Sequence, residues 1–183
     1  MVKHPKESIK SYMSKFKYDL GIIGLGYVGL PLAVYSIDAG LKVFGYDTNS
    51  EKVLKLNQGV SPIEDVSDKT LNSSIDSGLI FSDESKSLRD CEHIVISVPT
   101  PLTDFKPDLS YVISAAQEIA KNVVKGQIII LESTTYPGTT LEVLIPEIQK
   151  ISDLKPGEDI FFGYSPERID PGNKEWNFKN TPK

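Results

Sequence analysis

The sequence is poor in the residues that cross-link proteins or bind metals. Its 183 residues include one cysteine and two histidines. A single cysteine excludes an internal disulfide and a multi-cysteine zinc site, and it is typical of a protein in a reducing cytosol. The histidines, His4 and His93, are too far apart in sequence to form a local metal motif. We therefore predict no metal site.

Long apolar runs are also missing. No run approaches the roughly 20 residues that a transmembrane helix needs. Residues 1–17 are basic but lack the apolar region of a secretory signal. With 20 Lys and Arg against 25 Asp and Glu, the net charge of −5 argues against non-specific nucleic-acid binding. We predict a cytoplasmic protein with no nucleic-acid or membrane partner, consisting of a basic extension (1–17) and one domain (18–183).

Beyond residue 18, short apolar runs alternate with longer amphipathic stretches, which is the pattern of βαβ units. The strands are expected at 18–23, 41–46, 79–81, 93–98, 127–131 and 159–163. The helices are expected at 27–39, 49–57, 67–77, 84–89, 109–123 and 139–150. This order predicts an α/β fold: a Rossmann-type, doubly wound, mainly parallel sheet with helices on both faces.

Single residues refine this prediction. Gly40 and Gly126 stand where glycines would end the first and fifth helices. The runs at 93–98 and 127–131 are almost wholly apolar, as expected for parallel strands that helices cover on both faces.

A glycine-rich turn follows the first expected strand. Gly24, Gly26 and Gly29 form a G-x-G-x-x-G motif that contains Tyr27 and Val28 and opens into a helix. In such a motif the first glycine permits a tight turn, the second admits a pyrophosphate, and the third lets helix and strand pack closely. The helix N-terminus attracts the phosphates. The turn predicts a dinucleotide site, although glycines serving packing alone would give the same pattern.

Asp47 ends the second expected strand, 23 residues after Gly24 (47 − 24 = 23). A carboxylate about 20 residues after the motif hydrogen-bonds the adenosine ribose and would repel a 2′-phosphate. Since no arginine follows closely, NAD is favoured over NADP. Asp47 is also a candidate cap for the next helix. Lys52 is expected either near the adenosine or in solvent.

Three further segments follow expected strands in a fixed order. They are Val98–Pro101 (VPTP), Glu132–Thr140 (ESTTYPGTT) and Ser165–Gly172 (SPERIDPG). Together with GLGYVGLPLA they closely resemble the UDP-glucose/GDP-mannose dehydrogenase family of nucleotide-sugar 6-dehydrogenases, from about Tyr18 to the end of the chain. The residues of the last two segments are most similar to those of the branch that acts on UDP-N-acetylhexosamines.

The resemblance implies an oxidation of the C6 alcohol of a UDP-sugar, with UDP-N-acetylglucosamine the first candidate, to a carboxylate with two NAD. It implies passage through an aldehyde, a cysteine-bound thiohemiacetal and a thioester. It also implies a homodimer and a C-terminal domain that makes most of the substrate contacts. Sugar acids of this kind commonly feed polysaccharide biosynthesis.

The resemblance also assigns roles to residues of this chain. The glycine turn, Asp47 and Lys52 match cofactor positions. Val98, Thr100 and Thr134 match further cofactor contacts. Thr135 matches a threonine that holds water, and Glu167 matches a glutamate linked to thioester hydrolysis. Arg168 and Ile169 match contacts to the sugar nucleotide. Glu167 is thus assigned both to catalysis and to the substrate.

Residue chemistry alone leaves plainer alternatives. Pro99 and Pro101 stiffen a loop, Thr139 and Thr140 could cap a helix, and a Glu–Arg pair is often a surface ion pair.

The family's nucleophilic cysteine lies well beyond the SPER motif, and we expect Cys91 to be a structural or incidental thiol. The chain alone is therefore expected to be inactive, as the NAD-binding fragment of a longer enzyme. Two other functions stay open. One is a two-electron hydroxyacid-type dehydrogenase, and the other is a non-enzymatic NAD-binding module.

Overall fold

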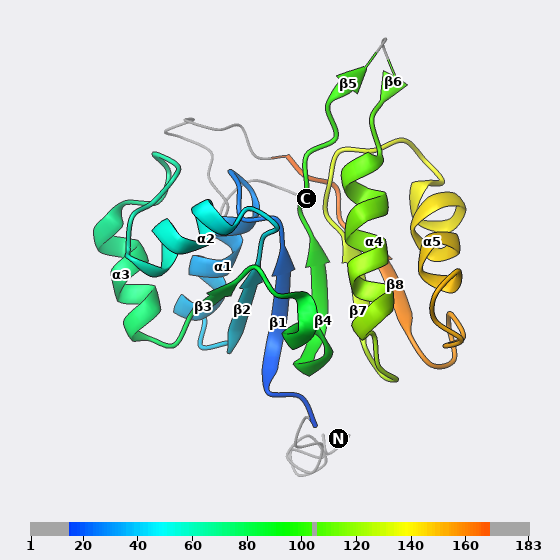
Figure 1. The fold of residues 1–183 in the computed structure, drawn as a ribbon, viewed down its shortest axis with the longest axis horizontal. Coiled ribbons are helices and arrows are strands. Elements are labelled where there is room, and N and C mark those ends of the chain that lie inside the picture. Colours follow the sequence, from blue (N-terminus) through cyan, green and yellow to red (C-terminus); the bar gives the residue numbers. More distant parts are fainter. Residues whose placement is uncertain (1–14, 104–105, 169–183) are drawn as a thin grey trace, which may run out of the picture.

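A computed structural model describes residues 15–103 and 106–168. Its centre is a parallel sheet with the strand order β3-β2-β1-β4-β7-β8 (Figure 1). Its strands are β1 (Tyr18–Ile23), β2 (Val43–Tyr46), β3 (Ile80–Ser82), β4 (Cys91–Ile96), β7 (Ile128–Leu131) and β8 (Phe161–Tyr164). Counting these six strands along the chain gives 3-2-1-4-5-6, the Rossmann order. Successive strands are therefore added toward one edge of the sheet from β1 to β3 and toward the other edge from β4 to β8, so the strand order reverses between β1 and β4.

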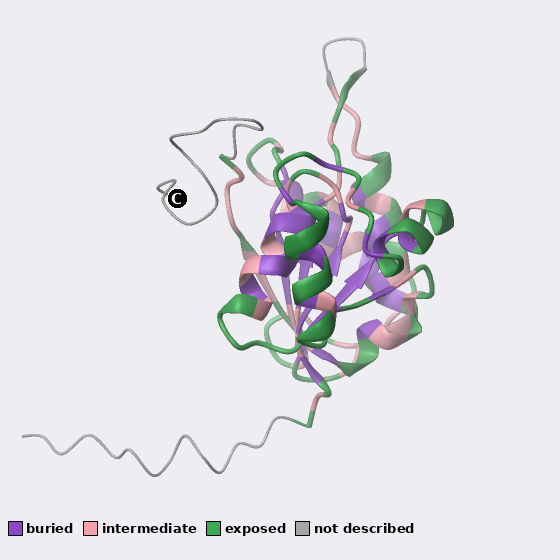
Figure 2. Ribbon diagram, turned by 90° about the vertical axis from the view of Figure 1, so that its left-hand side faces the viewer, coloured by how far each residue is buried: buried purple, intermediate pink, exposed green. Residues whose placement is uncertain are grey.

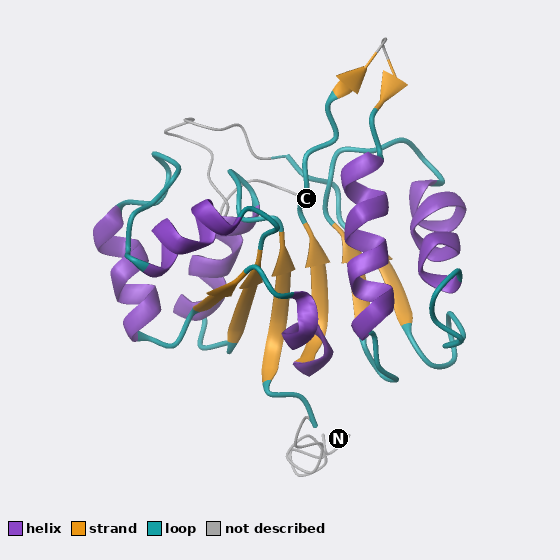
Figure 3. Ribbon diagram, viewed as in Figure 1, coloured by secondary structure: helices purple, strands orange, loops and turns teal. Residues whose placement is uncertain are grey.

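Helices cover both faces of this sheet (Figure 3). They are α1 (Gly29–Asp38), α2 (Ser50–Asn57), α3 (Asp68–Asp76), the 3₁₀ helix η1 (Ser85–Asp90), α4 (Ser110–Asn122), the π-helical turn η2 (Thr140–Leu144) and α5 (Ile145–Gln149). One buried cluster joins α1, α2 and α3 to one face, and another joins η1, α4 and α5 to the other. The predicted doubly wound fold is confirmed.

The central strands show why their sequences are uninterrupted apolar runs. In β4, Ile94 and Ile96 belong to the cluster beneath α4, whereas Val95 belongs to the cluster beneath α1. Alternate side chains of a strand point to opposite faces. Because both faces are covered, all three residues are buried. The strands in the middle of the domain are accordingly purple in Figure 2.

The outer strand β8 is far less enclosed than β1. Its end residues Phe161 and Tyr164 are 43% and 51% exposed. Among the described strands, β8 pairs in parallel with β7 alone.

Two helix ends test the glycine predictions. Gly40 has φ +88° directly after the cap of α1, and the N–H groups of Gly40 and Leu41 donate to Ile37 and Ser36. This is a Schellman end, as predicted. The prediction for Gly126 is wrong. α4 ends at Asn122 with an extended cap residue, and Gly126 turns the chain later, before β7.

The remaining differences concern short elements. The helix expected at 84–89 is the 3₁₀ helix η1, and the one expected at 139–150 divides into η2 and α5. A hairpin of β5 (Leu102–Thr103) and β6 (Lys106–Pro107) was not predicted, and it projects beyond the sheet in Figure 1. The extension predicted over 1–17 lies mostly outside the described residues. Within 15–103 and 106–168, no helix is long and apolar enough to cross a membrane.

Candidate dinucleotide-binding site

The motifs singled out in the sequence meet at the carboxyl edge of the sheet. Two adjoining cavities of about 290 and 310 Å³ lie there, and both are lined by Gly24, Asp47, Lys52, Val98 and Pro99. The first cavity extends toward α4 and the second toward the loops after β7 and β8. Each is near the lower limit for a ligand pocket. A dinucleotide would therefore occupy both.

Each glycine of the turn meets a different constraint. Gly24 has φ +92°, a conformation that side chains disfavour, and a Cβ on Gly29 would lie 1.8 Å from the Gly24 carbonyl oxygen. A Cβ on Gly26 would meet no described atom within 4 Å, although Gly26 lines the second cavity. Two glycines therefore serve the protein backbone, whereas Gly26 keeps the cavity wall open for a ligand. The constraints at Gly24 and Gly29 are those predicted from the motif, and the approach of a pyrophosphate to Gly26 stays a prediction.

Ser97 holds the turn from the neighbouring strand. Its hydroxyl donates to the carbonyl oxygens of Gly24 at 2.9 Å and Ile23 at 3.1 Å. The sequence analysis did not select Ser97. The available signal was a polar residue directly after the apolar run of β4, which is unusual in a covered strand.

Asp47 is buried, with 7% exposure, at the boundary of the two cavities. Its carboxylate accepts hydrogen bonds from the backbone N–H groups of Leu25 at 2.9 Å and Asn49 at 3.0 Å. The first bond links the end of β2 to the glycine turn. Asp47 does not cap α2, contrary to one of its suggested roles. The cap is Asn49, whose side chain accepts from the Lys52 N–H, because Asn49 directly precedes the first turn.

Lys52 contacts Asp47 directly. Its ammonium lies 2.6 Å from Asp47 Oδ2, and its side chain is 28% exposed. It is therefore neither a freely solvated lysine nor remote from the predicted ribose site. Three donors already approach the carboxylate of Asp47, which has about four lone-pair sites. Of these donors, the flexible lysine is the one that can move most easily.

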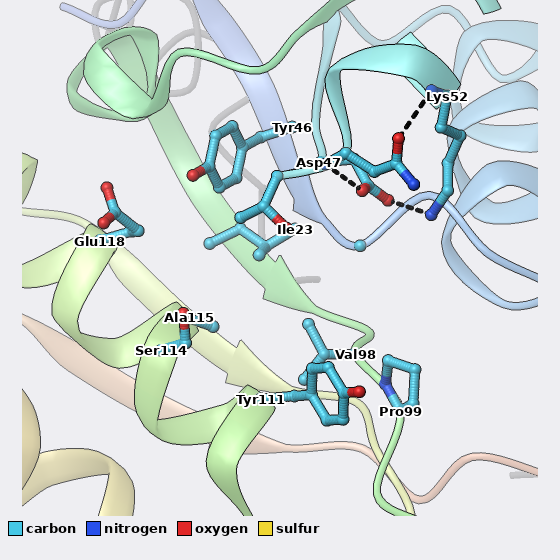
Figure 4. A pocket seen from close by; sticks show the side chains of 13 residues that line it. Ile23, Tyr46, Asp47, Lys52, Val98, Pro99, Tyr111, Ser114, Ala115 and Glu118 are labelled. Carbon is cyan, nitrogen blue, oxygen red and sulfur yellow. Dashed lines mark hydrogen bonds and ion pairs between the residues drawn. The ribbon is translucent and has the colours of Figure 1, made fainter.

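The far side of the first cavity is formed by α4 (Figure 4). Tyr111, Ser114, Ala115 and Glu118 line it. None of these four residues was predicted as a site residue from the sequence. Their spacing of i, i+3, i+4 and i+7 nevertheless places them on one face of a helix. A helical face that combines polar residues with a small one, at the carboxyl edge of the sheet, was the available signal.

Tyr46 lies opposite Glu118, with its hydroxyl directed toward the Glu118 carboxylate in Figure 4. Burial raises the pKa of Tyr46, and the negative charge of Glu118 adds to the shift. A hydrogen bond from Lys121 lowers the pKa of Glu118, with a smaller contribution from Ser85. The cavity therefore presents an ionised carboxylate and a neutral phenol at neutral pH.

The second cavity collects residues from three loops. Thr100, Thr134 and Glu167 all line it, and Thr100 Oγ1 donates to the Thr134 carbonyl oxygen at 2.5 Å. Ser133 ties the same two loops together by donating to the Val98 carbonyl oxygen at 2.9 Å. Tyr27 and Val28 line the cavity on the glycine side. The structure thus brings Glu167 together with all the predicted cofactor residues except Gly29, which packs behind the turn and lines neither cavity.

Other predicted residues lie elsewhere. Thr135 lines neither of the two cavities but a third one, together with Tyr136 and Tyr164. Arg168 is exposed and is absent from the lining of both dinucleotide cavities, although its N–H donates to Glu167 Oε1 at 2.7 Å. Ile169 lies outside the described residues. The suggestion that Thr139 caps a helix is wrong, because its hydroxyl donates backward to the Tyr136 carbonyl oxygen.

Cys91 is fully buried at the start of β4, at the opposite end of that strand from the cavities. Burial raises the pKa of its thiol to about 12. The thiolate is the nucleophilic form of cysteine, so Cys91 is a structural thiol, as expected. In the described ranges, no group of three His, Cys, Asp or Glu residues could hold a metal ion.

These features fit a dinucleotide. The open wall at Gly26 admits a pyrophosphate, the carboxylate of Asp47 suits ribose hydroxyls, and the apolar side chains of Ile23, Val98 and Ala115 suit a base. A parallel sheet in the Rossmann order, with this turn at its carboxyl edge, defines a dinucleotide-binding domain.

The chain belongs to the UDP-glucose/GDP-mannose dehydrogenase family, and residues 18–183 match the model of its NAD-binding domain. The dinucleotide of this domain is accordingly NAD. The UDP-N-acetyl-D-glucosamine 6-dehydrogenases of Pseudomonas aeruginosa and Salmonella typhi are 41% and 38% identical to it, over 90% of the chain in each case.

Solved structures agree with this assignment. The UDP-D-ManNAc dehydrogenase of Pyrococcus horikoshii matches with a TM-score of 0.78 and 37% identity, over 84% of this chain and 37% of its own. The GDP-mannose dehydrogenase of Pseudomonas aeruginosa matches with a TM-score of 0.76 and 31% identity, over the same shares. The chain spans 38% of the length of each of the two 6-dehydrogenases.

Proposed function

We propose that this chain is the cofactor-binding part of an enzyme that oxidises the C6 alcohol of a UDP-sugar to a uronic acid with two NAD. UDP-N-acetylglucosamine is the first candidate, since two of the most similar relatives are named for that substrate. The observation that carries the proposal is the meeting of Thr134 and Glu167 with the glycine turn in one cavity. The hydroxyacid and binding-module alternatives give no reason for Glu167 to lie there.

In this proposal the residues around the first two cavities hold NAD. The turn of Gly24, Gly26 and Gly29, with Tyr27 and Val28, binds the pyrophosphate. Asp47 accepts from the adenosine ribose, with Lys52 beside it, and Val98, Thr100 and Thr134 line the path to the nicotinamide. The proximity of Asp47 to the Leu25 N–H, at 2.9 Å, supports a ribose position directly beside the pyrophosphate turn.

Glu167 is proposed to orient or deprotonate the water that hydrolyses the thioester. Its place in the lining of the second cavity, together with Thr134, supports a position near the nicotinamide. Such general-base assistance contributes about 100- to 10,000-fold to a rate. We assign Thr135 to holding that water, and Arg168 and Ile169 to the sugar nucleotide. Thr135 and Arg168 do not line the second cavity, so their assigned roles require a substrate that extends from this cavity past both residues.

NAD, when bound, accepts the hydride in each of the two oxidations. The overall change consumes one alcohol, one water and two NAD⁺, and it yields one carboxylate, two NADH and three protons. The covalent route also needs a thiolate close to the nicotinamide, and Cys91 is buried away from both cavities. We therefore assign the nucleophile to a part of the longer enzyme outside this chain, and we expect this chain alone to be inactive. We further propose that the full-length enzyme is a cytoplasmic homodimer.

The test is the stoichiometry of the full-length enzyme. UDP-N-acetylglucosamine should yield two NADH per sugar, and UDP-glucose, UDP-N-acetylgalactosamine and UDP-N-acetylmannosamine should react more slowly. The 183-residue chain should yield none under the same conditions. One NADH per substrate, or turnover of 2-hydroxy acids instead of UDP-sugars, would contradict the proposal and support the hydroxyacid alternative.

A further inference from the structure

The proposed NAD site determines the direction in which the dinucleotide runs through the first cavity. The pyrophosphate lies at the glycine turn and the adenosine ribose at Asp47, which lines both cavities. The adenine base is attached to that ribose on the side away from the phosphates. It therefore extends into the first cavity, between Ile23 and Val98 on one side and Ala115 on the other.

Two carboxylates line this cavity, Asp47 at the ribose end and Glu118 on α4. Figure 4 shows Glu118 on the far side of the cavity from Asp47 and Lys52. The edge of adenine farthest from the ribose carries its exocyclic amine, which is a hydrogen-bond donor. Carboxylates accept from the exocyclic amines of bases. Hypoxanthine has a carbonyl oxygen at the same place, which a carboxylate repels.

The carboxylate of Glu118 is held in position but keeps room for a further donor. Lys121 approaches Oε1 at 2.6 Å, and the Ser85 hydroxyl donates to Oε2 at 2.7 Å. Asn122 donates in turn to the Ser85 hydroxyl at 3.1 Å. An ionised carboxylate accepts about four hydrogen bonds. The two that the structure gives it leave capacity for the amine.

We propose that Glu118 reads the exocyclic amine of the adenine and makes this domain selective for adenine over hypoxanthine dinucleotides. The inference rests on the proposed function, since it places NAD in these two cavities. Ser85 and Lys121 act as positioning residues, because they touch Glu118 and not the cavity space. The alternative role of Glu118 is to fasten η1 to α4 through Ser85, with no effect on the base.

The experiment compares the binding of NAD and nicotinamide hypoxanthine dinucleotide to the 183-residue chain by calorimetry. The wild type should prefer NAD by about tenfold or more, the value of one hydrogen bond to a charged group. In Glu118→Gln the side-chain amide can donate to the hypoxanthine carbonyl, so the preference should fall below about threefold.

One variant serves as the control. Glu147→Gln removes a similar Glu–Lys pair, formed with Lys150 at the end of α5, where no residue lines the first cavity. It should keep the wild-type preference, and thermal unfolding verifies that all variants are folded.

The possible failures are distinct. If the wild type binds both dinucleotides equally, or if Glu118→Gln keeps the preference, Glu118 does not read the base, while NAD binding itself still stands. If the folded wild type binds neither dinucleotide, the proposed function is contradicted and the role of Glu118 with it.

Discussion

Two regions of this domain contribute to the site in different ways. In the region of β1, α1 and β2, the site is fixed by contacts within the domain: Gly29 packs directly on Gly24, and Asp47 is buried among three donors. In the region of β7 and β8, Arg168 is exposed, as are the ends of the strand that precedes it, Phe161 and Tyr164.

The difference indicates which part of the site is preorganised for ligand binding. The NAD region needs little rearrangement on binding, and preorganisation of this kind reduces the entropic cost of binding. In the sugar region, among the described residues, nothing encloses Thr135 and Glu167 in one cavity. We therefore expect changes in the first region to alter the fold and NAD binding, and changes in the second to alter turnover.

The largest effect is expected from Gly29→Ala. Its Cβ would lie 1.8 Å from the Gly24 carbonyl oxygen and 2.5 Å from Ser97 Oγ. Such overpacking against backbone should cost about 3 kcal/mol or more of the free energy of unfolding, measured by urea denaturation. Gly26→Ala is the matched control, because no described atom lies within 4 Å of its Cβ. It should keep the stability and lose NAD binding. Equal destabilisation by both substitutions would contradict the division of roles.

Glu167→Gln tests the second region. In the full-length enzyme it should slow turnover by about 100-fold through loss of general-base assistance. In the 183-residue chain it should change NAD affinity by less than about twofold, which is under 0.5 kcal/mol. Steady-state kinetics and calorimetry supply the two values. An affinity loss as large as the rate loss would make Glu167 a cofactor-binding residue instead.

Asp47→Asn tests the first region by removing the charge of a side chain while keeping its size. It should weaken NAD binding by roughly 1–3 kcal/mol, because a charged acceptor becomes neutral. Asp19→Asn is the control, since Asp19 also accepts a backbone N–H, from Lys42 at 2.7 Å, but lines neither dinucleotide cavity. Calorimetry of both variants with NAD gives the comparison. Unchanged affinity in Asp47→Asn would remove Asp47 from the ribose site.

The smallest effect concerns Cys91, which belongs to neither region. Its thiol pKa is raised by burial from 9.0 to about 12. Between these values the unfolded chain loses the thiol proton while the folded chain keeps it, so stability should fall as pH rises, by up to about 1.4 kcal/mol per pH unit. Urea midpoints at pH 8 and 10 measure the fall, and Cys91→Ala should reduce it. At pH 8 iodoacetamide should label the unfolded chain only; rapid labelling of the folded chain would show an accessible thiolate.

The sequence predicted the parts of this protein that repeat a period or a fixed spacing. The strand β1 was predicted with its observed bounds, because both ends are marked by polar or glycine residues. The glycine turn and Asp47 follow a spacing that the backbone geometry requires. The bounds of the other five strands of the sheet differ from the prediction by one or two residues, since apolar patterns do not mark where hydrogen bonding begins.

Other features depend on tertiary contacts that sequence patterns do not contain. The bond of the Leu25 N–H to Asp47 appears only when β1 and β2 lie side by side. Glu118 belongs to the site because α4 packs on the face of the sheet to which Tyr46 of β2 points, although α4 follows β2 by more than 60 residues along the chain. Gly126 was misplaced because its positive φ serves a turn before β7, which has the same local signature as a helix end.

The most direct test of the account is a calorimetric titration of the 183-residue chain with NAD and, in parallel, with NADP. The account predicts saturable binding of NAD and much weaker binding of NADP, because the buried carboxylate of Asp47 repels a 2′-phosphate. Equal affinity for both, or no binding of either by a chain shown to be folded, would contradict a preorganised NAD site in this domain.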